Sequence, residues 1–585
     1  MRTFSWIAFL LVAFDTSHSV AENLILTNGE VYTMEPEQPW AHGLVVEGNK
    51  ILAVLEEEDT YDSYAKPDTR IIDLQGKFVL PGFIDGHTHF NAAGRLIIDV
   101  NLLKVADDEG LREEIARVVG ILEEGEWISG GLWGAYEQWE DGAASASVMS
   151  EARWKPHRHL IDDLTPHHPC LLNSFDRTLF LANTIALREA GLMDASLEGM
   201  ELDDTGKPTG LIINGSEALP RIRSVMKPRS ETRLLNENRA ALKHLRECGV
   251  VEIHDIVFPD QTKRYQQLQQ NGGLTCRIWL RPDLSRAREF AEKKLTRGLH
   301  PGTRQPDGML RYGAFKGYID GIMGNYSALF FRAYNDRPNR FGYYRHHTSD
   351  GPRPYRLPNM EKMYQLLLDA RETGMVANVH AIGTKGTSLM LDTYERLMKD
   401  IGRDLAGYRV IHAQVIRPED FPRFKALNVI AEVNPYHLSD DMRWMEERIG
   451  YERCKGAYAF KSLLENGAML SFASDWPGTS AAVYHAHPKY LIHAAVNRTT
   501  VKGLPKGGWF PEQKISVEEA LKAYTINNAI AAFEGELRGS IKPGKLADIT
   551  VCDRNLLTIP TDEILNMEIE MTIVDGKIVY EREKN

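Results

Sequence analysis

Leu80-Pro-Gly-Phe-Ile-Asp-Gly-His-Thr-His-Phe90 is a mostly apolar run that ends in two histidines, one residue apart. If the run is a strand, its side chains alternate between two faces, so His87 and His89 point to the same side. Two imidazoles that converge from one strand end can share a metal ion. Histidines with this spacing are also common as surface or hydrogen-bonded residues, so the metal hypothesis needs support from the rest of the chain.

The composition narrows the class of protein. The chain has 585 residues, of which 43% are hydrophobic, so it can form one large core and at least one smaller one. Its formal net charge is −12 and it has no basic block, which argues against nucleic acid as a main partner. Its five cysteines are scattered without a Cys-x-x-Cys pair. This pattern argues against a disulfide scaffold and against a zinc–thiolate site.

The first 21 residues resemble an export signal. Arg2 supplies a positive charge, Phe4 to Phe14 is apolar, and Ser19-Val20-Ala21 fits a cleavage site of small residues. A buried N-terminal helix is the alternative interpretation. No other segment approaches roughly 18 uncharged apolar residues, so we expect no stable membrane span after signal removal. We therefore expect an exported protein, periplasmic or secreted.

Both ends of the mature chain are predicted to be β-structure, in residues 22–80 and 540–585. Three hairpins are expected, with turns at Asn28-Gly29, Gly48-Asn49 and Asp575-Gly576. Because these two ends flank one long middle segment, we expect them to form one small β-sandwich domain together.

The middle of the chain, residues 81–539, alternates strands and helices and is predicted to be an α/β domain. With the strand before His87 there are eight such units, the number in a (β/α)8 TIM-like barrel. A doubly wound sheet is the alternative, although the glycine-rich phosphate motif that often marks it is missing. A helix over Val517–Phe533 is predicted to begin with a capping box from Ser516 to Glu519. The other expected helices are Met360–Thr373, Gly386–Lys399 and Tyr458–Asn466. The later strands are expected at Val250–Asp255, Cys276–Arg281, Tyr312–Ile319, Val376–His380, Arg409–Ala413, Val429–Val433 and Met469–Ala473.

Residues 91–248 are too long for one connection between a strand and a helix, so we expect an inserted subdomain there. It contains an aromatic cluster, and such clusters are usually core but can also wall a substrate pocket. Both interpretations stay open for its members, Trp127, Trp133, Tyr136 and Trp139.

Further polar side chains follow the ends of other predicted barrel strands, where active sites of such barrels lie. Each has an ordinary explanation alone. A histidine can bond a backbone carbonyl, an aspartate can cap a turn, and a lysine can extend to solvent. As a set they indicate a metal site, and the alternative for the set is an inactive relative that has kept its ligands. The candidate ligands are His87, His89, Lys316, His380, His412 and Asp475.

Pro81–His89, His412 and Ser474-Asp475 resemble the metal-dependent amidohydrolase superfamily. Within it, Lys316–Gly321, Val379–Gly383, His412–Gln414 and Ser474–Pro477 resemble the branch that includes N-substituted formamide deformylase. The resemblance covers nearly the whole mature chain, including Gly539–Asp548. Two segments depart from the branch. This chain has Gly383-Thr384-Lys385 where relatives have Gly-Asp-Arg or similar. It has Asp176-Arg177-Thr178 where relatives often have Asp-x-His. Both lie where substrate would be contacted.

The resemblance implies a two-metal site. His87, His89 and Asp475 would hold the first ion, and His380 and His412 the second. Lys316, carboxylated by CO₂, would bridge them, because an unmodified ammonium group would repel dications. Zinc suits these ligands, with iron or manganese as alternatives, and a one-metal site with unmodified Lys316 is the second arrangement. The ions would turn a shared water into hydroxide that attacks a carbonyl, and catalytic Asp475 would pass its proton to the leaving amine.

We therefore expect a metal-dependent hydrolase that cleaves a non-peptide C–N bond by a metal-bound hydroxide, in a linear amide such as an N-substituted formamide. A hydrolytic deaminase or cyclic amidase on the same fold is one alternative, and a non-catalytic binding protein is another. A deaminase would place a glutamate soon after His380, and Ala381–Thr384 contains none. Predicted substrate contacts are Trp133, Asp320 and Trp476. An oligomer is compatible with the sequence.

Overall fold

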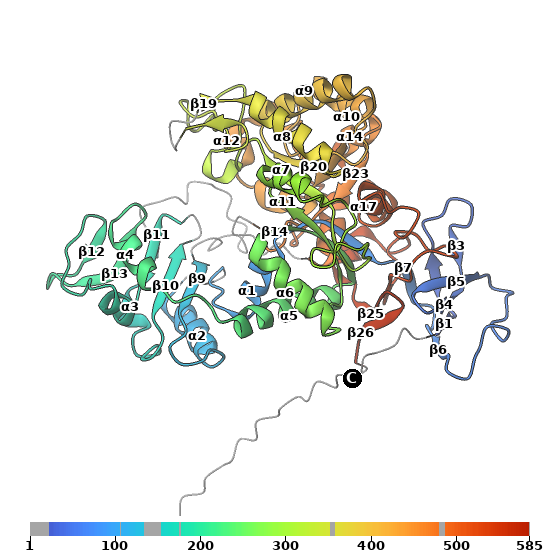
Figure 1. The fold of residues 1–585 in the computed structure, drawn as a ribbon, viewed down its shortest axis with the longest axis horizontal. Coiled ribbons are helices and arrows are strands. Elements are labelled where there is room, and N and C mark those ends of the chain that lie inside the picture. The colour runs from blue at the N-terminus through green and yellow to red at the C-terminus, as the bar shows by residue number, and fades with distance from the viewer. Residues whose placement is uncertain are drawn as a thin grey trace, which may run out of the picture.

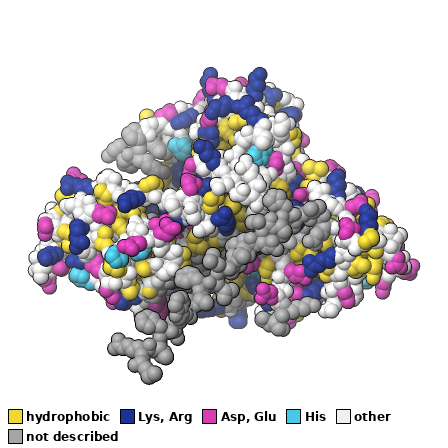
Figure 2. Space-filling model, turned by 60° about the horizontal axis from the view of Figure 1, so that its bottom comes forward, with side chains coloured by type: hydrophobic (Ala, Val, Ile, Leu, Met, Phe, Trp, Pro, Cys, Tyr) yellow, Lys and Arg dark blue, Asp and Glu magenta, His cyan; other side chains and the backbone are white. Residues whose placement is uncertain are grey.

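The structure is a computed structural model that describes residues 23–103, 105, 107–133, 154–174, 177–351, 357–478 and 486–583. The signal peptide expected at residues 1–21, and Tyr136, Trp139 and Asp176, lie outside this part and stay predictions. Within the described ranges, no helix combines the length and the apolar character that crossing a membrane requires. Lys and Arg side chains are interspersed with Asp and Glu over the face shown in Figure 2.

The two ends of the chain form two packed sheets. One has the order β5-β4-β1-β6 and the other the order β26-β25-β24-β7-β2-β3, which pairs strands from both ends of the chain. Their facing side chains share one hydrophobic cluster, which includes Leu24, Val31, Ile549 and Ile573. The strands are β1 (Leu24–Thr27), β2 (Glu30–Tyr32), β3 (Trp40–Ala41), β4 (Gly43–Glu47), β5 (Lys50–Leu55), β6 (Arg70–Asp73), β7 (Phe78–Pro81), β24 (Ile549–Cys552), β25 (Ile569–Val574) and β26 (Lys577–Glu581).

Two of the three predicted hairpins are confirmed. β4 pairs with β5 around Gly48-Asn49, and β25 pairs with β26 around Asp575-Gly576. The hairpin predicted at Asn28-Gly29 is wrong, because β1 pairs with β4 and β6 whereas β2 pairs with β3 and β7. This turn moves the chain from one sheet to the other, so that both strands can face the shared cluster.

The central strands are parallel and form two sheets. One has the order β16-β15-β14-β8 and the other the order β17-β20-β21-β22-β23. Two isolated parallel bridges, Asp283 to Lys316 and Thr88 to Trp476, connect the two sheets at both ends. The strands are β8 (Phe83–Thr88), β14 (Val250–Val257), β15 (Arg277–Pro282), β16 (Leu310–Tyr312), β17 (Ala314–Tyr318), β20 (Val376–Ala381), β21 (Arg409–His412), β22 (Ile430–Val433) and β23 (Leu470–Phe472).

Two predicted elements are divided in the structure. The strand predicted over Tyr312–Ile319 breaks at Gly313, where a Cβ atom would lie 2.0 Å from the Trp279 ring. The fully buried indole therefore packs directly on the backbone. The helix predicted over Val517–Phe533 becomes α16 (Val517–Ala523) and α17 (Ile526–Ala531), although its capping box is confirmed. The Tyr524 carbonyl accepts a hydrogen bond from Ile84 N at 2.9 Å, which draws the backbone from the helix to β8.

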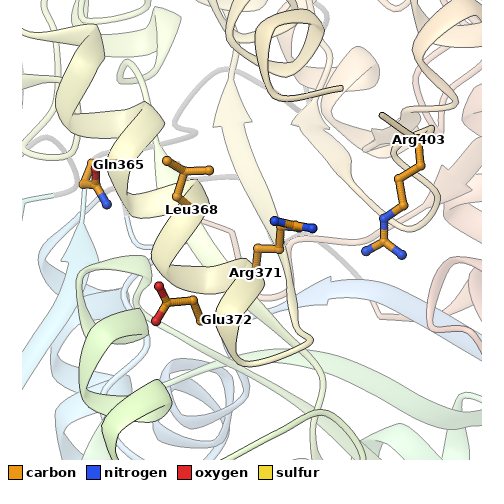
Figure 3. A pocket seen from close by; sticks show the side chains of 5 residues that line it. All are labelled: Gln365, Leu368, Arg371, Glu372 and Arg403. Atoms are coloured by element: carbon orange, nitrogen blue, oxygen red, sulfur yellow. The ribbon is translucent and has the colours of Figure 1, made fainter. Parts of the chain in front are cut away.

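Helices lie outside the central strands. α8, α9 and α14 agree with the predicted helices to within two residues at each end. A pocket lined by Gln365, Leu368, Arg371, Glu372 and Arg403 lies along α8 (Figure 3), and its lining includes none of the predicted site residues. The helices are α5 (Glu231–Glu247), α6 (Pro259–Gln270), α7 (Ala287–Glu292), α8 (Met360–Glu372), α9 (Thr384–Ile401), α10 (Phe421–Leu427), α11 (Pro435–Asp441), α14 (Phe460–Glu465) and α15 (Pro488–Asn497).

The segment between β8 and β14 has its own sheet, in the order β12-β13-β11-β10-β9. Trp133 is fully buried on one face of this sheet with Ile128 and Leu172, and Trp127 is buried in a second cluster. Trp133 is therefore part of this core, and the substrate contact at this residue stays a prediction. Figure 1 shows this sheet and the N-terminal strands on opposite sides of the central strands. The elements are α1 (Phe90–Ile98), α2 (Asp108–Val119), β9 (Ile128–Trp133), β10 (Cys170–Ser174), β11 (Leu179–Ala182), α3 (Thr184–Glu189), β12 (Met200–Leu202), β13 (Pro208–Ile213) and α4 (Ala218–Val225).

Gly86 lies where β8 approaches β23, and this close approach gives a test of the packing. A Cβ atom at Gly86 would lie 2.8 Å from the Phe472 carbonyl oxygen and 3.0 Å from Ser471 Oγ. Because a backbone carbonyl cannot rotate away, we expect Gly86→Ala to lower the free energy of unfolding by about 1–3 kcal/mol. Urea unfolding followed by circular dichroism measures the change.

The matched control is Gly120→Ala at the end of α2, where the nearest atom would be 3.5 Å from the new Cβ. We expect this control to stay within about 0.5 kcal/mol of the wild type. Equal stability of Gly86→Ala and the wild type would show that β8 and β23 can separate without cost.

Candidate metal centre

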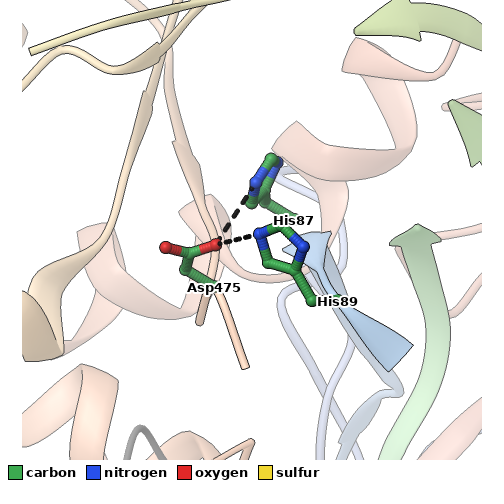
Figure 4. Close-up of side chains that lie close together, drawn as sticks. All are labelled: His87, His89 and Asp475. Carbon is green, nitrogen blue, oxygen red and sulfur yellow. Dashed lines mark ion pairs between the residues drawn. The ribbon is translucent and has the colours of Figure 1, made fainter. Parts of the chain in front are cut away.

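Two histidines and an aspartate converge at the ends of β8 and β23 (Figure 4). Nε2 of His87 lies 3.3 Å from Asp475 Oδ1, and Nε2 of His89 lies 3.1 Å from the same oxygen. The backbone fixes this arrangement, because Asp475 N donates to the His87 carbonyl at 2.9 Å and His89 N donates to the Trp476 carbonyl at 2.8 Å. The structure therefore brings together the three side chains predicted to hold a first metal ion.

The shared oxygen, Asp475 Oδ1, is buried, and in the described part of the chain it has no hydrogen-bond partner. Burial alone would raise the pKa of Asp475, but the imidazoles of His87 and His89 outweigh that effect and hold the pKa well below its usual range. Buried carboxylate oxygens are normally satisfied by donors or by a cation. An ionised oxygen beside two imidazole nitrogens is a donor set that fits a divalent metal ion.

The far side of His87 faces a buried glutamate that the sequence analysis missed. Glu432, on β22, has Oε1 3.2 Å from His87 Nδ1 and is paired with Arg281 at 2.7 Å and Arg409 at 3.0 Å. Arg281 Nη1 also lies 3.0 Å from His87 Nδ1, so the two neighbours favour opposite tautomers. With a metal ion on Nε2, the proton must sit on Nδ1, and Glu432 is the acceptor for it.

The remaining candidate ligands lie beside this group. Lys316 Nζ, on β17, is 3.4 Å from His87 Nε2. The His412 ring is centred 5.6 Å from that of His87 and 4.5 Å from that of His380. The structure thus places all six candidates at neighbouring strand ends. Among the described residues, Asp475 also forms a compact group with His412 and a further histidine, His437, whereas His380 belongs to no such group.

Hydrogen bonds orient the second pair of imidazoles. His412 Nδ1 lies 2.7 Å from Asn434 Oδ1, and His380 Nε2 lies 3.1 Å from the Gly321 carbonyl oxygen. Donation to these acceptors leaves a lone pair on His412 Nε2 and on His380 Nδ1. Burial lowers the pKa of both histidines well below the usual range, so both are neutral at pH 7. Neutral imidazole is the form that binds metal ions.

Lys316 is a buried lysine with an altered charge state. Burial lowers its pKa to about 7, against the opposing effect of the Glu432 and Asp475 carboxylates. A large fraction of the side chain is therefore a neutral amine near pH 7. The neutral amine is the nucleophilic form, and only that form can add to CO₂.

Two residues predicted to contact substrate have structural roles, and the substrate contacts themselves stay predictions. Asp320 is completely buried, and its carboxylate accepts hydrogen bonds from three backbone amides, Leu329 N at 2.8 Å, Gly383 N at 2.9 Å and Ile382 N at 3.1 Å. It therefore fixes the connections after β17 and β20. The Trp476 ring is buried and stacked on His244 at 5.1 Å between centroids, and it is the Trp476 carbonyl that holds His89.

His437 is the other residue that the sequence analysis missed. It lies in α11, with Nε2 3.6 Å from Asp475 Oδ2, and burial lowers its pKa to about 4, which keeps it neutral. It follows the end of β22 by four residues, so strand periodicity gave no signal for it. Glu432 could have been found, because it is the one charged residue in the apolar run Val429–Val433.

A family model described as the amidohydrolase family matches residues 70–580. The chain belongs to the amidohydrolase family. This amidohydrolase is 30% identical over 576 residues to Protein LONG AFTER FAR-RED 3 of Arabidopsis thaliana, which covers 96% of this chain and 92% of that protein. It is 25% identical over 587 residues to N-substituted formamide deformylase of Arthrobacter pascens, with 96% and 98% covered. The predicted resemblance to that branch is confirmed.

The fold of this amidohydrolase is also found in a solved structure. An uncharacterized metal-dependent hydrolase from Pyrococcus horikoshii superposes with a TM-score of 0.71 at 24% identity and covers 92% of this chain and 99% of its own. The chain therefore shares the mixed α/β fold of that structure, and as a member of the amidohydrolase family it is an enzyme.

Glu432 gives a test of how His87 is held. In Glu432→Gln, one amide oxygen must serve His87, Arg281 and Arg409, so the hydrogen bond that fixes the His87 tautomer weakens. We expect the affinity for Zn²⁺ to fall about 10- to 100-fold, measured by competition with a chromophoric chelator.

The matched control is Glu534→Gln, because Glu534 pairs with Arg311 and Arg538 and makes no contact with His87 among the described residues. Circular dichroism on both variants separates loss of affinity from loss of fold. Wild-type affinity in a folded Glu432→Gln variant would show that His87 is oriented without this carboxylate.

Proposed function

We propose that this amidohydrolase cleaves the C–N bond of a linear amide, with N-substituted formamides as the substrate class. The observation that carries the proposal is the buried Asp475 Oδ1 atom, which has no hydrogen-bond donor in the described ranges and faces Nε2 of His87 and His89 at 3.3 and 3.1 Å. Such an atom fits a divalent ion. A divalent ion can activate water and polarise an amide carbonyl, and a neighbouring carboxylate can transfer the proton. The name of the relative from Arthrobacter pascens supports the formamide class.

In the proposed site, His87, His89 and Asp475 would hold one divalent ion, and His380 and His412 a second. Lys316 as a carbamate would bridge them, with zinc as the first choice of metal and iron or manganese as alternatives. The pKa of about 7 supports the carbamate, because it makes the neutral amine available. When bound, such ions supply an activated water and polarise the scissile carbonyl.

Asp475 carries the proton transfers in this proposal. Its carboxylate is ionised at neutral pH, so it can accept a proton from the attacking water and deliver it to the leaving nitrogen. Its two oxygens face different partners, with Oδ1 toward His87 and His89 and Oδ2 toward His437. The neutral His437 ring lines the side of the carboxylate away from the first ligand set.

The proposal includes the architecture that presents these residues. The two parallel sheets would be one closed (β/α)8 barrel, which is supported by the bridges at both ends, and the site would lie at the carboxyl ends of its strands. Residues 22–80 and 540–585 would be the β-sandwich domain, and residues 91–248 the inserted subdomain.

Metal stoichiometry tests the two-metal site. We expect the reconstituted wild type to bind about two equivalents of metal, and Lys316→Met to bind about one, because the bridging ligand is lost. Mass spectrometry of metals after gel filtration gives the count, and ¹³C NMR after incubation with ¹³C-bicarbonate reports the carbamate. Lys362→Met, which removes an exposed lysine of α8, is the control and should match the wild type.

One equivalent in the wild type would instead support a one-metal, deaminase-like site. A wild type that binds no metal would support a non-catalytic binding protein and would contradict the proposed function.

Asp475→Asn tests the proton transfers. We expect kcat/KM for an N-alkylformamide to fall about 10²- to 10⁴-fold, because an amide side chain can neither accept nor deliver the proton. The control is Asp392→Asn, which removes an exposed carboxylate paired with Arg423. Metal content is measured in parallel, so that a lost ligand and a lost base are distinguished. Full activity in Asp475→Asn would remove this residue from the mechanism.

A further inference from the structure

Arg345 is a half-buried cation beside the candidate metal centre. It lies in the connection between β17 and α8, and its backbone N–H donates to the Ile319 carbonyl at 2.9 Å, which anchors the base of its side chain at the end of β17. Among the residues that the structure describes, Arg345 forms no ion pair, and its buried Nε atom has no hydrogen-bond partner. Residues 352–356, farther along the same connection, contain no Asp or Glu.

One aromatic ring separates this cation from the candidate ligands. The guanidinium carbon of Arg345 lies 5.2 Å from the centre of the Tyr318 ring. Lys316 Nζ lies 4.9 Å from the same ring centre, and the His380 ring is centred 5.6 Å away. A small molecule with its scissile carbonyl at these ligands therefore has a positive charge within reach.

The nearby carboxylates are already engaged. Asp320 accepts three backbone hydrogen bonds, as described above. Asp283 lies 3.0 Å from His347 Nε2, and its Oδ1 accepts from Ser285 N at 2.9 Å. His347 in turn accepts from Tyr318 N through Nδ1 at 3.1 Å, so both of its nitrogens hold the end of β17.

The two buried arginines behind His87 are paired with an acid, whereas the buried Arg498 is held by the backbone carbonyls of Tyr458 and Trp509. Arg281 and Arg409 both contact Glu432, at 2.7 and 3.0 Å. A partly desolvated cation without an anion costs free energy, and an anionic ligand would offset that cost. The absence of a partner at Arg345, in the described residues, therefore points to a ligand.

We propose that Arg345 binds a carboxylate of the substrate, so that the preferred substrates are formamides whose nitrogen substituent carries a carboxylate, as in N-formyl amino acids. The planar guanidinium can donate two parallel hydrogen bonds to a carboxylate, which orients as well as binds it. The inference rests on the proposed function, because it names the substrate class of the same site.

Lys385 strengthens the positive potential there. It stands at the position of the arginine in the Gly-Asp-Arg pattern and keeps the positive charge, while Thr384 replaces the aspartate. Its Nζ lies 5.7 Å from the centre of the ring of Tyr344, the residue before Arg345. In hydrolysis the C–N bond breaks, the carbonyl carbon gains an oxygen from water, and a proton reaches the nitrogen, which leaves as the amine of an amino acid. The carboxylate takes no part in the bond changes and stays on Arg345.

The kinetic test compares racemic N-formylleucine with its methyl ester, because the two differ only in the negative charge. With the reconstituted wild type we expect kcat/KM for the acid to exceed that for the ester about 10- to 100-fold. In Arg345→Met this ratio should fall by a similar factor, mainly through KM, and Arg345→Lys should restore only part of it, because a lysine does not form the paired hydrogen bonds. Arg337→Met, an exposed arginine of the same connection, should keep the wild-type ratio.

A binding measurement separates this inference from the proposed function. Isothermal titration of the reconstituted enzyme with leucine, which is not hydrolysed, should show saturable binding that Arg345→Met weakens about tenfold or more. Leucine methyl ester should bind much more weakly to the wild type.

Equal kcat/KM for acid and ester, or an unchanged ratio in Arg345→Met, would overturn the carboxylate site. If neither compound is hydrolysed but leucine binding depends on Arg345, the carboxylate site stands and the formamide hydrolase function fails.

Discussion

Charges buried among the central strands must be neutralised by one another, and this constraint fixes the candidate metal centre. Glu432 is fully buried and contacts Arg281, Arg409 and His87. Arg409 also contacts His254, and His254 contacts Glu252, which pairs with arginines near the other ends of the strands. Separating any of these side chains from its partners would leave an unpaired charge in a medium of low polarity, which is costly. The strands that carry these residues are therefore held in one register.

That register sets the positions of the ligands. Asp85, on β8, accepts hydrogen bonds from His87 N, Ser474 N and the Tyr524 hydroxyl, and so joins the two ligand-bearing strand ends to the segment between α16 and α17. The backbone hydrogen bonds set the directions of the imidazoles, and among the described residues Oδ1 of the carboxylate between them has no hydrogen-bond donor. Charged side chains and backbone amides thus contact the polar atoms of the candidate centre on one side, and the proposed metal ion and substrate would bind on the other.

The sequence predicts the grouping of the candidate ligands better than the residues that support them, for physical reasons. His87, His380, His412 and Asp475 follow apolar runs, and parallel strands bring their ends to one edge, so their approach to one another could be predicted. Glu432 sits inside a strand, where its meaning depends on arginines from other strands. Asp320 accepts hydrogen bonds from distant backbone amides, and Trp133 packs against residues from other strands. Neither kind of long-range contact leaves a local pattern in the sequence. The turn at Asn28-Gly29 has ordinary hairpin residues. Only the packing of the two sheets shows that the strands on either side of this turn belong to different sheets.

The pairing of β24 with β7 has a consequence for how the enzyme is made. β7 leads directly into β8 and its two histidines, while β24 and β25 come from the last forty residues of the chain. During synthesis β7, the strand that leads into β8, therefore lacks its partner strand until residues 549–552 have been made. The β-sheet that precedes the two histidines can close only after the central strands between β7 and β24 have been synthesised.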